Sequence, residues 1–179
     1  MRKIKKSRRS RCLFIIVAFV SGYANTGSQE AHVHGAATLT LMQENSSVEI
    51  KLKSPAVNIV GFEHSAKSAK ERELLAQAEH ILNAPETLFS FTDASCKAEH
   101  IDLDTASLQK QKHDHHHRHH SEIEAHYRFT CKHGDKLKSV ATHLFSYFPS
   151  VEKIDAYWVT ENKQGFATLT AGNNRFLLK

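Results

Sequence analysis

The sequence predicts an α+β fold that is mainly antiparallel β, a twisted sheet or sandwich of about seven or eight strands, with one amphipathic helix and a long His-rich hairpin loop. Three observations predict it. Short, partly alternating apolar segments recur between turn-forming residues, as is typical of antiparallel strands. A single segment, beginning near residue 65, changes to the helical period. A histidine-rich run separates two of the strand segments.

Residues 1–24 have the three-part pattern of a cleavable secretory signal peptide. The basic start contains seven Lys and Arg residues and no acidic residue, an apolar run follows at 13–20, and the small residues Gly22 and Ala24 stand where a signal peptidase cuts. The apolar run is too short to cross about 30 Å of hydrocarbon, and no later stretch is longer, so we expect no membrane span after cleavage. An uncleaved anchor is the alternative. The mature chain, 25–179, is then expected to be a single domain.

The charge of the mature chain differs from that of the full chain. The full chain has 24 Lys and Arg against 19 Asp and Glu, a formal charge of +5 and a pI near 9.1. Removal of the seven basic residues of the signal leaves 17 basic residues against 19 acidic ones. Nucleic-acid binding normally needs a basic surface, so we expect no nucleic-acid partner.

Two strands joined by a turn are predicted at the start of the mature chain. Residues 33–42 are Thr-rich and alternate in part, and residues 48–53 alternate apolar with charged side chains. The turn falls at 44–47, and Ser54-Pro55 ends the second strand. The following segment, 56–64, is expected to be irregular or a short extended piece with Gly61 as its hinge.

The segment after residue 65 predicts the one helix. Ser68 and Glu71 are spaced as a capping box, and Pro85 ends the helical pattern. Lys and Glu occupy the polar face. The apolar face consists of Leu74, Leu75, Ala78, Ile81 and Leu82.

The rest of the chain predicts antiparallel strands. Residues 97–104 and 122–131 are expected to form a hairpin with an unusually long tip at about 105–121. Further strands are predicted at 138–145, 154–160, 166–170 and 175–178, separated by turns that contain Pro, Gly or Asn.

The mature chain keeps only Cys96 and Cys131. Two cysteines of an exported protein usually form a disulfide, so we expect a bridge between them. It would close a loop of about 36 residues and contribute about 3 to 4 kcal/mol in the chain-entropy model. The alternative is a pair of thiolate metal ligands.

The predicted hairpin tip contains HDHHHRHH, six of the 14 histidines within residues 113–120. Neutral imidazole is the commonest transition-metal ligand, and a tract this dense offers many two- to four-ligand subsets. We therefore expect a metal-binding domain of limited selectivity, in which copper or nickel should bind in vitro as well as or better than zinc because imidazole sites follow the Irving–Williams order. The alternatives are a solvated tract without a ligand and a pH-responsive patch. The candidate ligands are His113, Asp114, His115, His116, His117, His119 and His120.

A second candidate is His32-Val33-His34 at the start of the first predicted strand. On a strand, residues two apart point to the same face, so both rings could bind one ion. His64 offers a third ligand from a loop. These three histidines form either one joint site or separate surface residues.

Motifs for catalysis are missing from the sequence. It has no G-x-S-x-G, no H-E-x-x-H and no Gly-rich phosphate loop, and Glu63 is the sole candidate for the base of a hydrolytic zinc site. We therefore do not expect an enzyme.

Five segments follow one another along the mature chain: AHVHGAATLTL, SPAVNIVGFEH, the His-rich tract between the two cysteines, LFSYFPSVEKI and GFATLTAGNNRFLL. Together they resemble the ZrgA-like family of periplasmic zinc-regulated, zinc-binding proteins. The resemblance implies a periplasmic protein that assists zinc acquisition beside a zinc ABC importer and its solute-binding protein. It places the family's His-rich loop on residues 113–120 and its H-x-H motif on His32 and His34.

The leading hypothesis is therefore a periplasmic zinc-binding accessory to uptake whose loop captures ions. The alternative is a periplasmic buffer or detoxification protein that sequesters excess zinc, copper or nickel. Both functions use the same ligands, so the sequence does not separate them.

Overall fold

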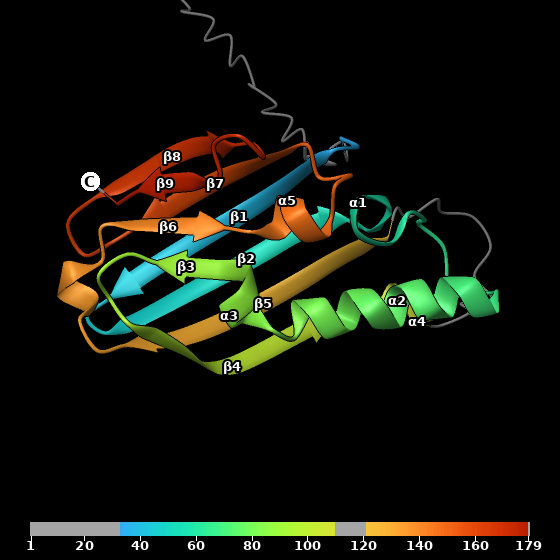
Figure 1. Cartoon of the computed structure of the whole chain (residues 1–179), viewed down its shortest axis with the longest axis horizontal. Helices are drawn as coiled ribbons and strands as arrows, with labels where there is room; N and C mark the ends of the chain where they lie inside the picture. The colour runs from blue at the N-terminus through green and yellow to red at the C-terminus, as the bar shows by residue number, and fades with distance from the viewer. Residues whose placement is uncertain (1–32, 110–120, 179) are drawn as a thin grey trace, which may run out of the picture. The chain divides into compact units, whose positions relative to one another are not determined.

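The computed structural model describes residues 33–109 and 121–178, which lie within one compact unit, Ala31–Lys179. Nine strands in these residues form two open sheets, six in the order β4-β5-β2-β1-β7-β8 and three in the order β3-β6-β9 (Figure 1). The predicted α+β class is confirmed. The strands are β1 (Ala36–Glu44), β2 (Ser47–Pro55), β3 (Phe89–Phe91), β4 (Cys96–Asp104), β5 (Glu122–Cys131), β6 (Ser139–Thr142), β7 (Lys153–Val159), β8 (Gln164–Leu169) and β9 (Arg175–Leu177). The helices are α1 (Ala56–Val60), α2 (Ala69–Leu82), α3 (Pro85–Leu88), α4 (Ala106–Gln109), α5 (Leu144–Tyr147) and the 3-10 helix η1 (Gly134–Lys136).

The six-stranded sheet contains both predicted hairpins. β1 pairs antiparallel with β2 around a turn at Asn45, whose φ is 51°, and β4 pairs antiparallel with β5 from Cys96↔Cys131 to Asp104↔Glu124. The expectation of an antiparallel arrangement is wrong at one pair, because β1 and β7 are parallel. The chain reaches β7 from β6 and α5, outside the large sheet, and a parallel pair needs a connection of this kind.

The three-stranded sheet packs across one face of the six-stranded sheet, and the buried residues lie between them (Figure 1). Every second residue of β1, β2, β5 and β7 points into this core, as the alternation predicts. Aromatic rings fill its centre, since Phe89 of the small sheet makes edge contacts with Tyr127 and Phe129 of β5. Burial of this apolar surface is the main force that holds the two sheets together.

The buried Tyr127 hydroxyl lowers the stability of this core. The side chain has 0% exposure, its hydroxyl has no hydrogen-bond partner among the described residues, and burial raises its pKa well above the ordinary value. A buried polar group without a partner costs about 1 to 3 kcal/mol. We therefore expect Tyr127→Phe to raise the free energy of unfolding by about 1 kcal/mol in urea denaturation. Tyr157→Phe, at an exposed site, is the matched control and should have no effect, whereas a destabilised Tyr127→Phe protein would contradict the prediction.

The helix α2 forms where its periodicity and caps predict it. The Ser68 hydroxyl accepts a hydrogen bond from the Glu71 N–H at 3.1 Å, and the Glu71 carboxylate accepts one from the Ser68 N–H at 2.8 Å, which completes the capping box. Leu75, Ala78 and Leu82 are buried against the core. Pro85 does follow the end of the helix, but it also begins α3.

Several short elements differ from the predictions. The segment 56–64, expected to be irregular, begins with α1. The strand predicted at 138–145 is limited to β6, because the chain turns into α5 at Leu144. β3 was not predicted from its three residues. Periodicity cannot assign elements of three to five residues, because so few positions do not define a period.

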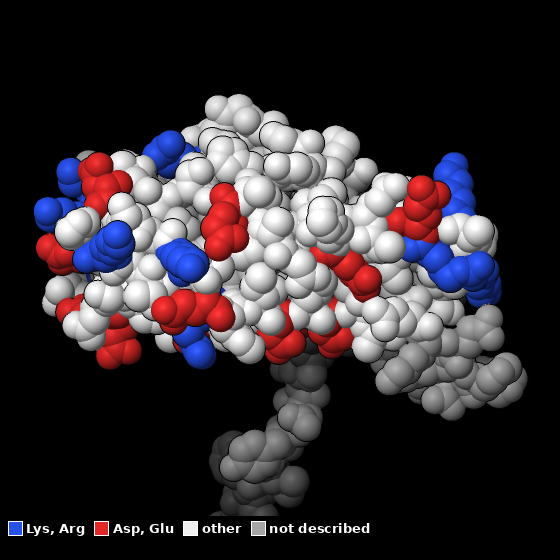
Figure 2. Space-filling model, turned by 60° about the horizontal axis from the view of Figure 1, so that its bottom comes forward, with Lys and Arg blue, Asp and Glu red and all other residues white. Residues whose placement is uncertain are grey.

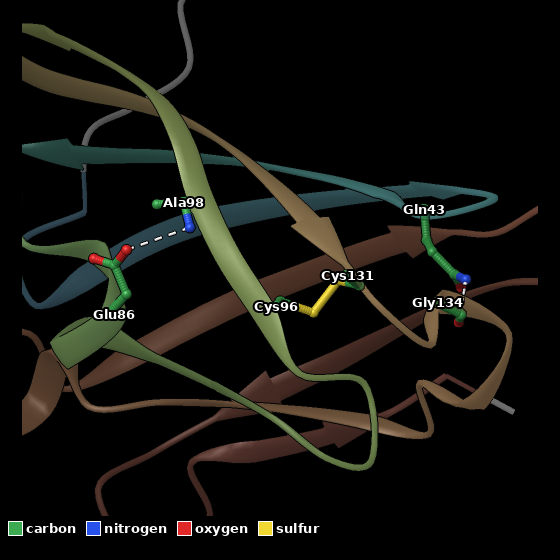
Figure 3. The surroundings of a disulfide bond; sticks show 6 residues. All are labelled: Gln43, Glu86, Cys96, Ala98, Cys131 and Gly134. Carbon is green, nitrogen blue, oxygen red and sulfur yellow. Dashed lines mark hydrogen bonds between the residues drawn. A yellow bond between two sulfur atoms is a disulfide. The ribbon is translucent and has the colours of Figure 1, made fainter.

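The disulfide is confirmed and joins directly opposed residues of β4 and β5 (Figure 3). Cys131 is buried, and β4 is an edge strand of the six-stranded sheet. The register of β4 shifts between Ala98 and His100, and there the Ala98 N–H donates to the Glu86 carboxylate of α3 at 3.3 Å (Figure 3). The edge strand is therefore attached to the rest of the fold by a covalent bond and by a side chain that satisfies its bulge.

Lys and Arg side chains lie among acidic ones toward the left and right ends of the face shown in Figure 2, and only acidic side chains lie over its middle. On the outer face of the large sheet, neighbouring strands pair opposite charges. Glu49 accepts from Arg128 at 2.9 Å, and Lys51 lies 2.9 Å from Glu124. The Arg128 guanidinium holds the pKa of the Glu49 carboxyl below its usual value. Within the described ranges, no helix has the length and hydropathy of a membrane-spanning segment.

Candidate metal centre

His34 lies in a turn immediately before β1. Gly35 has a φ of 80°, a left-handed conformation that favours glycine, and its carbonyl accepts hydrogen bonds from the N–H groups of Glu152 and Lys153. The expectation that His34 lies on the strand is therefore wrong, because the chain enters β1 only after this glycine turn. His32 lies outside the described residues.

The buried side chain of Asn58 fixes this turn to α1. Its Oδ1 accepts a hydrogen bond from the Gly35 N–H at 2.9 Å, and its Nδ2 donates to the Ala36 carbonyl at 2.9 Å. Asn58 is only 4% exposed, so water contributes little to these contacts. The backbone that carries His34 is thus held by an amide that matches one N–H and one C=O group.

The His34 ring faces the Glu63 carboxylate. The His34 Nε2 atom lies 3.6 Å from the Glu63 Oε1 atom, and the His34 side chain is 69% exposed whereas that of Glu63 is 20% exposed. The ring is thus accessible from solvent, and the carboxylate lies below it. Glu63 belongs to the loop that follows α1. One short segment of chain therefore holds the His34 turn, through Asn58, and also supplies the carboxylate that faces the His34 ring.

His64 faces a different carboxylate. Its Nε2 atom lies 3.7 Å from Oε1 of Glu71 at the start of α2, its Nδ1 atom is hydrogen-bonded to the Ser65 carbonyl at 3.0 Å, and its ring stacks on Phe62 with centroids 5.3 Å apart. Hydrogen bonds from the backbone N–H groups of Ser68 and Lys67 hold the pKa of Glu71 below its usual value.

The two segments that flank the His-rich tract attach to the same region. The Ser121 hydroxyl donates to the Glu63 carbonyl at 2.9 Å, and the Ser121 carbonyl accepts from the Ala56 N–H at 2.8 Å. On the other side of the tract, the Leu108 carbonyl accepts from the Ala66 N–H at 2.8 Å. The chain therefore leaves and re-enters the described fold beside the loop that carries Glu63 and His64. The predicted tract ligands, His113, Asp114, His115, His116, His117, His119 and His120, lie outside the described residues.

A family model for ZrgA family zinc uptake proteins matches residues 31–178. The chain belongs to the ZrgA family. The match covers the two described ranges and the tract between them, and it confirms the family resemblance seen in the sequence. The family is one of zinc uptake proteins and not a family of enzymes. No curated protein matches the chain significantly.

The two His–carboxylate pairs of this ZrgA family member have distances suited to an ion. Two ligands of a tetrahedral zinc, each about 2.0 to 2.1 Å from the metal, lie about 3.3 Å apart. The observed separations of 3.6 and 3.7 Å exceed this by a few tenths of an ångström, which small side-chain rotations would supply. Each pair thus provides one nitrogen and one oxygen donor, a mixture that zinc accepts.

His34 and His64 face different carboxylates, and the described residues contain no cluster of three or more His, Cys, Asp or Glu side chains around one point. The joint site of His32, His34 and His64 stays a prediction, because one of its members is outside the described residues. The sequence indicates Glu63 only as a candidate catalytic base and Glu71 only as part of a helix cap. The capping-box spacing identifies one role of Glu71, but no sequence signal shows that its second oxygen faces an imidazole.

Proposed function

We propose that this protein is a periplasmic zinc-binding accessory to zinc uptake, in which the His-rich tract captures ions and the His34–Glu63 pair, together with His32, forms a more ordered site. The family match carries the zinc-uptake part of this proposal. The composition of the tract and the attachment of its flanks beside Glu63 support the rest. The signal-like start of the chain supports the location.

The chemistry of the tract suits capture more than tight storage. Imidazoles are largely neutral near pH 7 and bind zinc without a preformed cage. Fixing a backbone residue costs about 1 to 2 kcal/mol, so an ion that must order several residues is held with moderate affinity. An ion held in this way can be released again to a stronger site. We propose that the acceptor is a zinc ABC importer or its solute-binding protein.

Replacing all six histidines of residues 113–120 with asparagine, which we call the tract variant, tests the capture step. We expect the zinc stoichiometry of the purified mature chain to fall, because asparagine keeps the polarity and removes the imidazole donors. The free energy of unfolding should change by less than about 0.5 kcal/mol, because the run contains no apolar side chain that a core could bury. Calorimetric zinc titration and urea denaturation measure the two quantities.

The matched control replaces three exposed histidines of the described fold, His80, His100 and His133, with asparagine. Their removal should leave the stoichiometry unchanged. If the tract variant bound as much zinc as the natural chain, capture by the tract would be rejected. Growth of a deletion strain distinguishes zinc delivery from zinc sequestration. Loss of an uptake accessory impairs growth under zinc chelation, whereas loss of a detoxification protein impairs growth in zinc excess.

A further inference from the structure

His64 and Glu71 are each oriented by contacts that leave one donor atom directed at the other. The Nδ1 atom of His64 contacts the Ser65 carbonyl, which can only accept a hydrogen bond, so Nδ1 carries the proton. In the neutral ring, the lone pair then lies on Nε2, the atom that faces Glu71. A histidine that ligates a metal usually has its other ring nitrogen fixed in this way, commonly by a backbone carbonyl.

The two oxygen atoms of the Glu71 carboxylate have different neighbours. Its Oε2 atom accepts hydrogen bonds from the backbone N–H groups of Lys67 and Ser68, both at 2.8 Å, while its Oε1 atom lies 3.7 Å from the His64 Nε2 atom. Two backbone donors hold the carboxylate in one orientation and favour its charged form. An oxygen donor is therefore fixed by the helix cap, and a nitrogen donor is fixed by Ser65 and by stacking on Phe62.

We infer that His64 and Glu71 form a second zinc site, separate from the His34–Glu63 pair, which holds the ion through two protein donors and leaves its other positions to water. This inference rests on the proposed function, and it gives the His64–Glu71 pair a role in the transfer of zinc. A site with open positions can accept an incoming ligand before the first ligands leave, so the ion exchanges readily. The chemistry fits transfer of zinc to the ligands of a receiving protein.

Two features of the site keep it weak. The His64 side chain is 53% exposed, so water competes for the ion. The start of α2 carries a partial positive charge that opposes a cation, although the charge of Glu71 offsets it. A zinc site that passes its ion on needs this balance, because a closed four-ligand site would retain the ion.

The competing account is an ion pair between a protonated His64 and Glu71, with no role in metal binding. The two accounts differ in the response of His64 Nε2 to zinc. The tract variant, in which the six histidines of 113–120 are replaced, removes the competing donors of the tract. In this variant at pH 7.5, nitrogen NMR of the histidine rings should show a zinc-dependent shift of His64 Nε2, while Nδ1 keeps its proton.

Substitutions in the tract variant complete the test. Glu71→Gln should weaken the zinc response of the His64 ring at least tenfold, and His80→Asn, at an exposed position of α2, should leave it unchanged. Glutamine still accepts the backbone hydrogen bonds, so the helix content by circular dichroism should be retained. A His64 ring that does not respond to millimolar zinc, or a response that keeps its full strength in Glu71→Gln, would overturn the inference. Failure of the proposed function would be seen separately, as equal zinc stoichiometry in the natural chain and the tract variant. That outcome does not depend on the response of His64.

Discussion

Replacing both Cys96 and Cys131 with alanine is expected to lower the free energy of unfolding by about 3 to 4 kcal/mol. The disulfide joins residues separated by 35 positions, so its removal gives the unfolded chain many additional conformations. In the folded state, the bridge fixes β4, an edge strand, to β5. Urea denaturation of the double variant and of the oxidised natural chain measures the difference.

Two controls separate the disulfide from other roles of the cysteines. The natural chain under reducing conditions should unfold at nearly the same urea concentration as the double variant, because neither has the bridge. The zinc stoichiometry of the double variant should equal that of the reduced natural chain. A stability loss below about 1 kcal/mol would contradict the chain-entropy argument. More zinc bound by the reduced chain than by the double variant would instead favour the thiolate alternative.

The fold was predictable wherever the local pattern determined the structure. Alternation along β1, β2 and β5 predicted their buried faces, and Ser68 with Glu71 predicted the start of α2. The parallel contact of β1 with β7 joins segments more than 100 residues apart and leaves no local pattern. The order of the strands was not predictable for the same reason, since it depends on how the two sheets bury each other's apolar faces.

The candidate site was predictable in its residue types but not in its pairs. His34 and His64 were identified because imidazole is a common ligand, a property of the side chain alone. Their partners Glu63 and Glu71 depend on the course of the backbone, which turns at Gly35 and again after α1. Asn58 was not identified as important at all. A single asparagine beside a strand has no recognisable sequence pattern, and its function became visible only from its burial and its two backbone contacts.

Asn58→Leu is expected to lower both stability and zinc binding. Leucine is similar in size to asparagine but cannot pair with the Gly35 N–H and the Ala36 carbonyl. The buried Gly35 N–H would lose its partner and the partly buried Ala36 carbonyl would lose one, at a cost of about 1 to 3 kcal/mol. His34 would lose the support that holds it beside Glu63, and loss of such support typically weakens metal binding about tenfold or more. Urea denaturation and zinc titration, both in the tract variant background, measure the two effects.

The matched control for this prediction is Asn174→Leu. The Asn174 Nδ2 atom donates to the Thr142 carbonyl at 2.9 Å, where the chain approaches the three-stranded sheet, so leucine removes a side-chain-to-backbone hydrogen bond away from His34. This change should lower the free energy of unfolding by about 1 kcal/mol and leave zinc affinity unaltered. If Asn58→Leu lost stability but kept its zinc affinity, Asn58 would support only the fold. An equal loss of zinc binding in both variants would show that general destabilisation, and not the placement of His34, reduces binding.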